Sequence, residues 1–101
     1  MKTHQPEPRT LRVTDLPEMT GANATEVRDA VRKVITPDCR TLQLDLSQTS
    51  FLDSSGLGAL VGLHKTMRLQ EGILQILHPT PAVMQLLELT RLHRLFEIVG
   101  A

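Results

Sequence analysis

The residues best suited to chemistry lie together in the run Asp53-Ser54-Ser55-Gly56. One carboxylate and two hydroxyls stand where a predicted strand ends and a predicted helix begins, and α/β sheets place their sites at this kind of edge. Unpaired amides and the dipole at a helix start would stabilise an added negative group. Asp and Ser are also common helix N-caps, so the residue types alone leave capping and function both open.

The serines do not fit a hydrolase. A nucleophile elbow has glycine two residues before and two residues after its serine. Leu52 stands at the first of these places for Ser54, and the corresponding residue for Ser55 is an aspartate. His64 follows Ser54 by ten residues, which is roughly 15 Å along a helix and too far for a general base. We therefore expect a protein that is not an enzyme.

Metal and cofactor sites have no sequence support. The glycines from Gly56 to Gly62 lack the Lys-Ser or Lys-Thr that completes a phosphate-binding loop, and the Gly58 to Gly62 spacing instead predicts close packing of a helix on the sheet. The chain has two Phe and neither Trp nor Tyr, so few aromatic side chains are available to stack against a ligand. We expect no cofactor and no metal, because metal-ligand spacing is absent among His4, His64, His78, His93 and Cys39.

Composition narrows the class of protein further. Eleven basic and eleven acidic side chains give zero formal charge, so we expect no binding to nucleic acid. The longest nearly apolar run, Gly56 to Leu63, is far shorter than the ~20 residues of a membrane span, so we expect no direct membrane insertion. A single cysteine and a start without an apolar signal segment predict a cytoplasmic location.

Hydrophobic periodicity predicts one domain in which strands and helices alternate. Residues 1–9 carry two prolines and no apolar pattern, so we interpret them as a flexible tail before a domain at 10–101. Apolar spacing from Val27 to Ile35 predicts an amphipathic helix, with Asn23 and Glu26 as a capping pair. Thr80 and Pro81 are expected to begin the last helix.

The remaining pattern predicts four strands and a central helix. The helix runs from Leu57 to about Met67, and the strands are Leu11–Val13 at a sheet edge, Arg40–Ser47, Ile73–His78 and Leu95–Val99. Alternation of this kind predicts an α/β fold: a mixed, mostly parallel sheet of about four strands with helices packed on it.

Two runs in the sequence carry a family resemblance. Leu42 to Ser47, followed by Phe51 to Leu60 with Asp53-Ser54-Ser55-Gly56 at its centre, resembles the signature of STAS domains, specifically of bacterial anti-sigma factor antagonists. Weaker similarity extends in register from Leu11 to Val99. The resemblance implies a single small STAS domain that acts in signal transduction and transcription regulation.

The resemblance also implies a partner-switching mechanism. The first serine of the motif, here Ser54, would be phosphorylated by an anti-sigma factor that is itself a serine kinase, and a PPM-type phosphatase would remove the phosphate. The unphosphorylated form would bind the anti-sigma factor, as a monomer or weak dimer. The predicted contact residues are Glu18, Thr20, Asp53, Ser54, Ser55, Gly56 and Leu57. The alternative is a STAS scaffold or accessory module, in a lipid-transport or stress-signalling assembly, that binds partners without phosphorylation.

Overall fold

The structure, a computed structural model, describes residues 1–100 and places them in one sheet with three α-helices and one 3₁₀ helix. The elements in chain order are β1 (Lys2–His4), β2 (Thr10–Thr14), α1 (Ala24–Val34), β3 (Thr41–Asp45), α2 (Ser54–Leu69), β4 (Ile73–Leu77), α3 (Pro81–Leu89), η1 (Leu92–Arg94) and β5 (Glu97–Val99). The predicted α/β class and the alternation of strands and helices are confirmed.

The sheet is mixed and mostly parallel, in the order β1-β2-β3-β4-β5. Strands β2 to β5 pair in parallel, and β1 pairs antiparallel with β2. The sheet thus has five strands rather than about four, because Lys2–His4 forms a strand inside the segment interpreted as a tail. β2 is consequently not the edge strand that the sequence predicted. All three residues of β1 are exposed, so no buried alternation marks this strand in the sequence.

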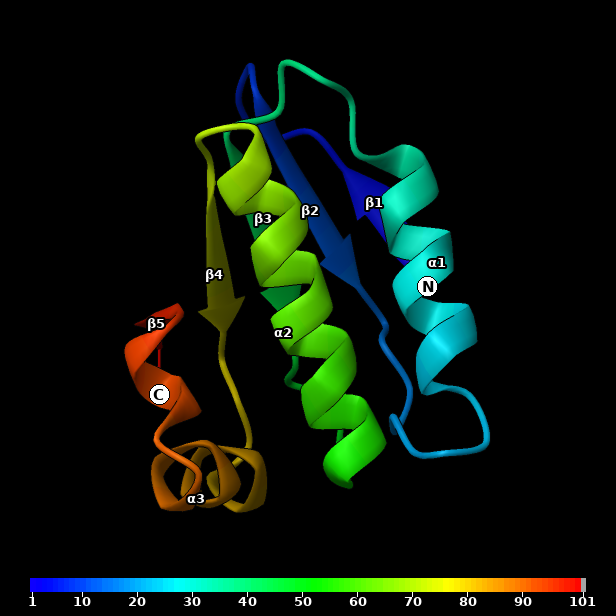
Figure 1. Cartoon of the computed structure of the whole chain (residues 1–101), viewed down its shortest axis with the longest axis vertical. Coiled ribbons are helices and arrows are strands. Elements are labelled where there is room, and N and C mark those ends of the chain that lie inside the picture. Colours follow the sequence, from blue (N-terminus) through cyan, green and yellow to red (C-terminus); the bar gives the residue numbers. More distant parts are fainter. Residues whose placement is uncertain (101) are drawn as a thin grey trace.

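Two helices cover one face of the sheet. Figure 1 shows α1 and α2 side by side in front of the strands, and α3 and η1 near the carboxyl ends of β3 and β4. The core between sheet and helices is aliphatic, with fully buried side chains such as Leu42 and Leu44 of β3 and Leu60 and Leu63 of α2. Burial of such side chains is the main favourable term in folding.

The opposite face of the sheet carries a row of hydrogen-bonded polar side chains. Arg12 Nε donates to Oε1 of Gln43 (2.8 Å), and Gln43 Nε2 donates to Oε1 of Gln75 (2.8 Å). Gln75 Nε2 in turn donates to Oε1 of Glu97 (2.7 Å). One residue from each of the strands β2 to β5 takes part, so the row supports the strand register on the face that no helix covers.

Helix α2 spans the length of the sheet and carries both glycines of the Gly58–Gly62 spacing. The prediction that these glycines pack on the sheet is wrong. A Cβ on Gly58 would meet nothing within 4 Å, and one on Gly62 would lie 3.1 Å from Cδ of Arg28 in α1. No helix within residues 1–100 is long and apolar enough to cross a membrane.

The helix caps were predicted with mixed success. Thr80 caps α3 as expected: its hydroxyl accepts the amide of Val83 (3.3 Å) with Pro81 in the first turn. Asn23 stands at the start of α1 but its side chain caps no helix amide. Its Oδ1 instead accepts the amide of Thr20 (2.9 Å) and its Nδ2 donates to the carbonyl of Glu18 (2.7 Å). Asn23 therefore shapes the loop before α1 rather than the helix.

Candidate functional site

The run that begins α2 is joined to the loop after β2 by main-chain hydrogen bonds. Met19 and Leu52 form an isolated parallel bridge, in which the Met19 amide donates to the carbonyl of Phe51 (3.2 Å). The Asp53 amide donates to the carbonyl of Met19 (3.2 Å). Below them the fully buried Thr49 hydroxyl donates to the carbonyl of Leu16 (3.0 Å). Two segments about 30 residues apart in the chain thus form one rigid turn at the carboxyl end of the sheet (Figure 1).

Asp53 is the N-cap of α2 and the centre of this turn. Its Oδ1 accepts the amides of Ser55 (2.8 Å) and Gly56 (3.0 Å), and its Oδ2 accepts the amide of Gly21 (3.0 Å) in the neighbouring loop. These bonds, the one from Gly56 foremost, hold the pKa of the Asp53 carboxyl below its usual value. The carboxylate is therefore charged at neutral pH and holds both segments.

Most of the first amides of α2 are already paired. The expectation that unpaired amides at this helix start would hold an added anion is therefore met only in small part. Asp53 occupies the amides of Ser55 and Gly56, and its own amide is bonded to Met19. Of the amides from Asp53 to Gly56, that of Ser54 has no protein partner among residues 1–100. A phosphate on Ser54 would therefore gain little from this helix beyond its dipole.

Ser54 and Ser55 both have exposed side chains, but their surroundings differ. Neither hydroxyl has a hydrogen-bond partner within residues 1–100, and Ser54 is the first residue of α2. The Ser55 hydroxyl faces the loop after β2, since a Cβ on Gly21 would lie 3.6 Å from it. The hydroxyl of Ser54 is the freer of the two for an incoming protein.

Gly56 and Leu57, both predicted as partner contacts, lie inside the domain and offer little exposed surface. Leu57 is 9% exposed and belongs to the core. A Cβ on Gly56 would overlap the carbonyl oxygen of Met19. Both residues therefore fix the turn, and the exposed surface is formed by their neighbours.

Glu18 and Thr20, predicted as contact residues, lie in the loop that is bonded to the turn. Glu18 is exposed, and its Oε1 accepts the hydroxyl of Ser50 (2.9 Å). Thr20 is half-buried, and its hydroxyl accepts the amide of Ala22 (3.2 Å). In the described chain neither Glu18 nor Asp53 forms an ion pair, so this surface has two carboxylates without a cation beside them.

Phe51 is a surface feature of the site that residue spacing did not indicate. It is 53% exposed although it is one of only two aromatic residues. Beside it lies an apolar hollow of about 200 Å³, lined by Ser50, Phe51, Leu52, Ala82, Val83 and Leu86. The signal in the sequence was an aromatic residue outside any predicted strand or helix, two residues before the cap of α2.

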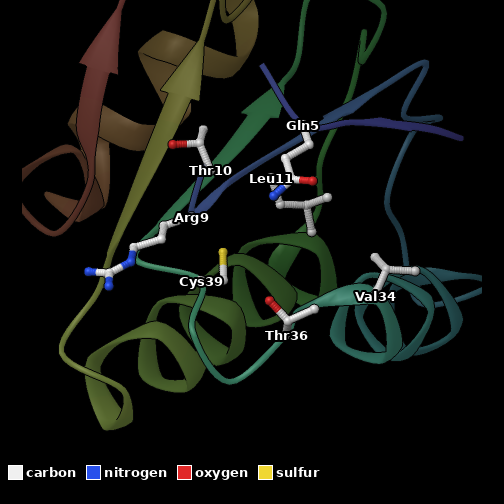
Figure 2. A pocket seen from close by; sticks show the side chains of 7 residues that line it. All are labelled: Gln5, Arg9, Thr10, Leu11, Val34, Thr36 and Cys39. Atoms are coloured by element: carbon white, nitrogen blue, oxygen red, sulfur yellow. The ribbon is translucent and has the colours of Figure 1, made fainter. Parts of the chain in front are cut away.

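A different hollow lies at the opposite end of the sheet (Figure 2). It measures about 100 Å³ and is lined by Gln5, Arg9, Thr10, Leu11, Val34, Thr36 and Cys39. The Cys39 thiol is directed to the carbonyl of Thr41 (3.4 Å), and burial raises its pKa, so it stays protonated. Small-molecule sites usually exceed ~300 Å³, and a protonated thiol is a poor nucleophile. This hollow offers no chemistry to the turn at Ser54. Within residues 1–100 no group of three or more His, Cys, Asp or Glu side chains could hold a metal ion.

Comparison with known proteins assigns the domain to a family. The family model of the STAS domain matches residues 2–100. The chain belongs to the STAS domain family. This STAS domain is 30% identical over 81 residues to the anti-sigma-B factor antagonist of Listeria monocytogenes, a match that covers 80% of this chain and 71% of that protein. That relative is named as a regulator and not as an enzyme.

Solved structures show the same fold. A crystal structure of a putative anti-sigma factor antagonist from Thermotoga maritima superposes with a TM-score of 0.83 at 23% identity, over 94% of this chain and 82% of that one. The Bacillus cell fate determinant SpoIIAA in its phosphorylated form gives a TM-score of 0.71 at 18% identity, over 96% of this chain and 88% of that one. The turn at Asp53 is therefore part of a fold that occurs in antagonist proteins.

The Asp53 carboxylate makes a pH-dependent contribution to the stability of this STAS domain. Because its pKa in the folded state lies below the ordinary value of 3.8, ionised Asp53 stabilises the fold above that value, and the contribution is lost as pH falls through the folded pKa. We expect Asp53→Asn to lower the midpoint of thermal unfolding at pH 7 and to differ less from wild type below about pH 4. The reason is that an amide NH₂ would replace one of the two accepting oxygens.

Thermal unfolding followed by circular dichroism, at pH 7 and below about pH 4, measures this effect. Asp15→Asn is the matched control, because Asp15 accepts no backbone amide among the described residues and its ion pair with Lys2 (3.4 Å) is exposed to solvent and contributes little. Equal midpoints for Asp53→Asn and wild type at pH 7 would show that the cap does not hold the turn.

Proposed function

We propose that this STAS domain is an anti-sigma factor antagonist that is switched by phosphorylation of Ser54. In the unmodified state it binds an anti-sigma factor that is also a serine kinase, and phosphorylation releases it. The single observation that carries the proposal is the Ser54 hydroxyl, which is exposed and, within residues 1–100, unpartnered on a turn fixed from two sides. Similarity to the anti-sigma-B factor antagonist supports the choice of partner.

The surface around Ser54 is suited to docking a protein. The carboxylates of Glu18 and Asp53 favour basic groups on the partner, since neither is neutralised within residues 1–100. Exposed Phe51 and the apolar hollow beside it supply area that an apolar side chain of the partner would cover. We expect a kinase that docks on this surface to bring its ATP to Ser54.

The geometry explains why a phosphate would weaken this contact. A phosphoserine adds roughly 1.5–2 negative charges and needs donors when it is removed from water. The amides of Ser55 and Gly56 are already bonded to Asp53, so the domain itself supplies few donors. Immediately after transfer the phosphate also faces the diphosphate of the nucleotide, an anion beside an anion. A 100-fold loss of affinity corresponds to only about 2.7 kcal/mol, well within the cost of burying an unpaired charge.

Reversal requires a phosphatase, and the proposed one is of the PPM type. The exposed position of Ser54 at the first residue of α2 leaves the phosphate accessible to such an enzyme. The cycle then depends on one side chain, and the fold need not change between the two states.

Binding measurements on the two forms test the proposal. The domain is incubated with each anti-sigma factor kinase of its own organism and ATP, and intact mass reports the modification. We expect the phosphorylated form to bind the kinase about 100-fold more weakly than the unmodified form. Equal affinities would contradict the switch. Tight binding without modification by any of these kinases would favour the STAS scaffold or accessory module.

A further inference from the structure

A third hollow lies on the side of α2 away from α1, far along the helix from Ser54. It measures about 290 Å³, near the lower limit of ~300 Å³ for small-molecule sites. It lies between the second half of α2, the start of β4, and the segment from η1 to β5. Its lining residues are His64, Arg68, Gly72, Ile73, Leu74, Arg94, Leu95, Phe96 and Glu97.

Two arginines border this hollow from different elements. Arg68 belongs to α2 and Arg94 to η1. Both are exposed, and neither forms an ion pair within residues 1–100. Guanidinium groups bind carboxylate and phosphate oxygens through paired hydrogen bonds, so two free guanidiniums at one hollow favour an anionic ligand.

His64 borders the same hollow one helical turn before Arg68. Burial, and then the charge of Arg68, lower the pKa of His64, so its ring is neutral at pH 7. Its Nδ1 is buried and is the one such side-chain nitrogen or oxygen without a partner in the described chain. A buried orphan N–H is costlier than an orphan lone pair, so the proton belongs on Nε2. His64 thus has a donor available for an oxygen atom.

Apolar and acidic groups complete the lining. Phe96 is buried and packs edge to face against His64, with ring centroids 5.8 Å apart, while Leu95 beside it is 43% exposed. Glu97 is the acidic residue of the lining, and its Oε1 accepts a hydrogen bond from Gln75 (2.7 Å). This bond places the Glu97 carboxylate on the face of the sheet opposite α2, so the two guanidiniums leave the hollow with a net positive charge.

We propose that this hollow binds a small organic anion, in which a carboxylate or a phosphate is attached to an apolar group. Arg68 and Arg94 bind the anionic oxygens, and the apolar group lies against Phe96 and Leu95. This site is separate from the turn at Ser54 and does not depend on the function proposed for that turn.

Titration of the ¹⁵N-labelled domain with defined probes tests the site by NMR. The probes are benzoate, hexanoate and phenyl phosphate, with inorganic phosphate as the probe that lacks an apolar group. We expect saturable shifts of the amides of Arg68, Gly72 and Phe96 with at least one organic probe, and weaker binding of inorganic phosphate. Comparison of benzoate with phenyl phosphate decides between the two anionic groups.

Variants distinguish the site from general attraction of anions. We expect Arg68→Gln and Arg94→Gln each to weaken binding about tenfold. Lys65→Gln is the matched control, because Lys65 is an exposed cation of α2 that does not line the hollow. We expect this variant to bind the probes as tightly as wild type does. Absence of saturable shifts at millimolar concentrations, an equal loss in Lys65→Gln, or equally tight binding of inorganic phosphate would each overturn the proposal.

Discussion

Ser54→Ala is expected to abolish phosphate transfer to this STAS domain, whereas Ser55→Ala is expected to leave it unchanged. Both side chains are exposed, so exposure alone does not separate them. Neither hydroxyl has a hydrogen-bond partner within residues 1–100, but that of Ser55 faces Gly21 in the loop bonded to Asp53. An in-line attack on ATP requires a hydroxyl that a kinase can surround, and Ser54 meets this condition.

Intact mass after incubation with kinase and ATP measures the stoichiometry of transfer for each variant. Neither substitution should change the fold, because the hydroxyls of Ser54 and Ser55 make no hydrogen bond within the described chain and alanine is well accepted in a first turn. Equal melting temperatures of the three proteins provide the control for folding. Full phosphorylation of Ser54→Ala would place the modification elsewhere and contradict the proposed switch.

Regular elements with a buried face were predictable from the sequence. β3, β4 and α2 each bury alternate or helically spaced aliphatic side chains, and the order of residues along the chain displays this period directly. β1 was missed because its pairing with β2 is a main-chain interaction of exposed residues, without an apolar face. Main-chain pairing of this kind has no signature in residue type.

At the site, too, features set by side-chain type were predictable and features set by main-chain pairing were not. The Asp53 cap and the exposed serines follow from residue types that prefer helix starts. The loop that holds this cap was not predictable, because the bonds of Met19 to Phe51 and Asp53 join main-chain atoms. Asn23 was assigned to the wrong bond for a related reason: an Asn side chain can pair with several nearby main-chain groups, and sequence spacing does not decide which.

Gly56→Ala is expected to be the most destabilising single change in the turn. The added Cβ would overlap the Met19 carbonyl oxygen and would lie 3.1 Å from Cβ of Met19 and 3.2 Å from Cδ2 of Leu52. The carbonyl is fixed by the amide of Asp53, so the main chain cannot yield without breaking that bond. Overpacking of this kind costs about 1–3 kcal/mol, which lowers the melting temperature of a domain of this size by roughly 4–8 °C for each kcal/mol.

Gly58→Ala provides the matched control on the same helix. A Cβ there would meet nothing within 4 Å, so the higher helix propensity of alanine should stabilise the domain by about 0.5–1 kcal/mol. Thermal or urea unfolding of both variants therefore should move in opposite directions from wild type. If Gly56→Ala were as stable as wild type, the loop at Met19 would be free to move away from α2. Ser54 would then lie on a mobile turn, and the argument that a partner meets a preformed surface would lose its structural basis.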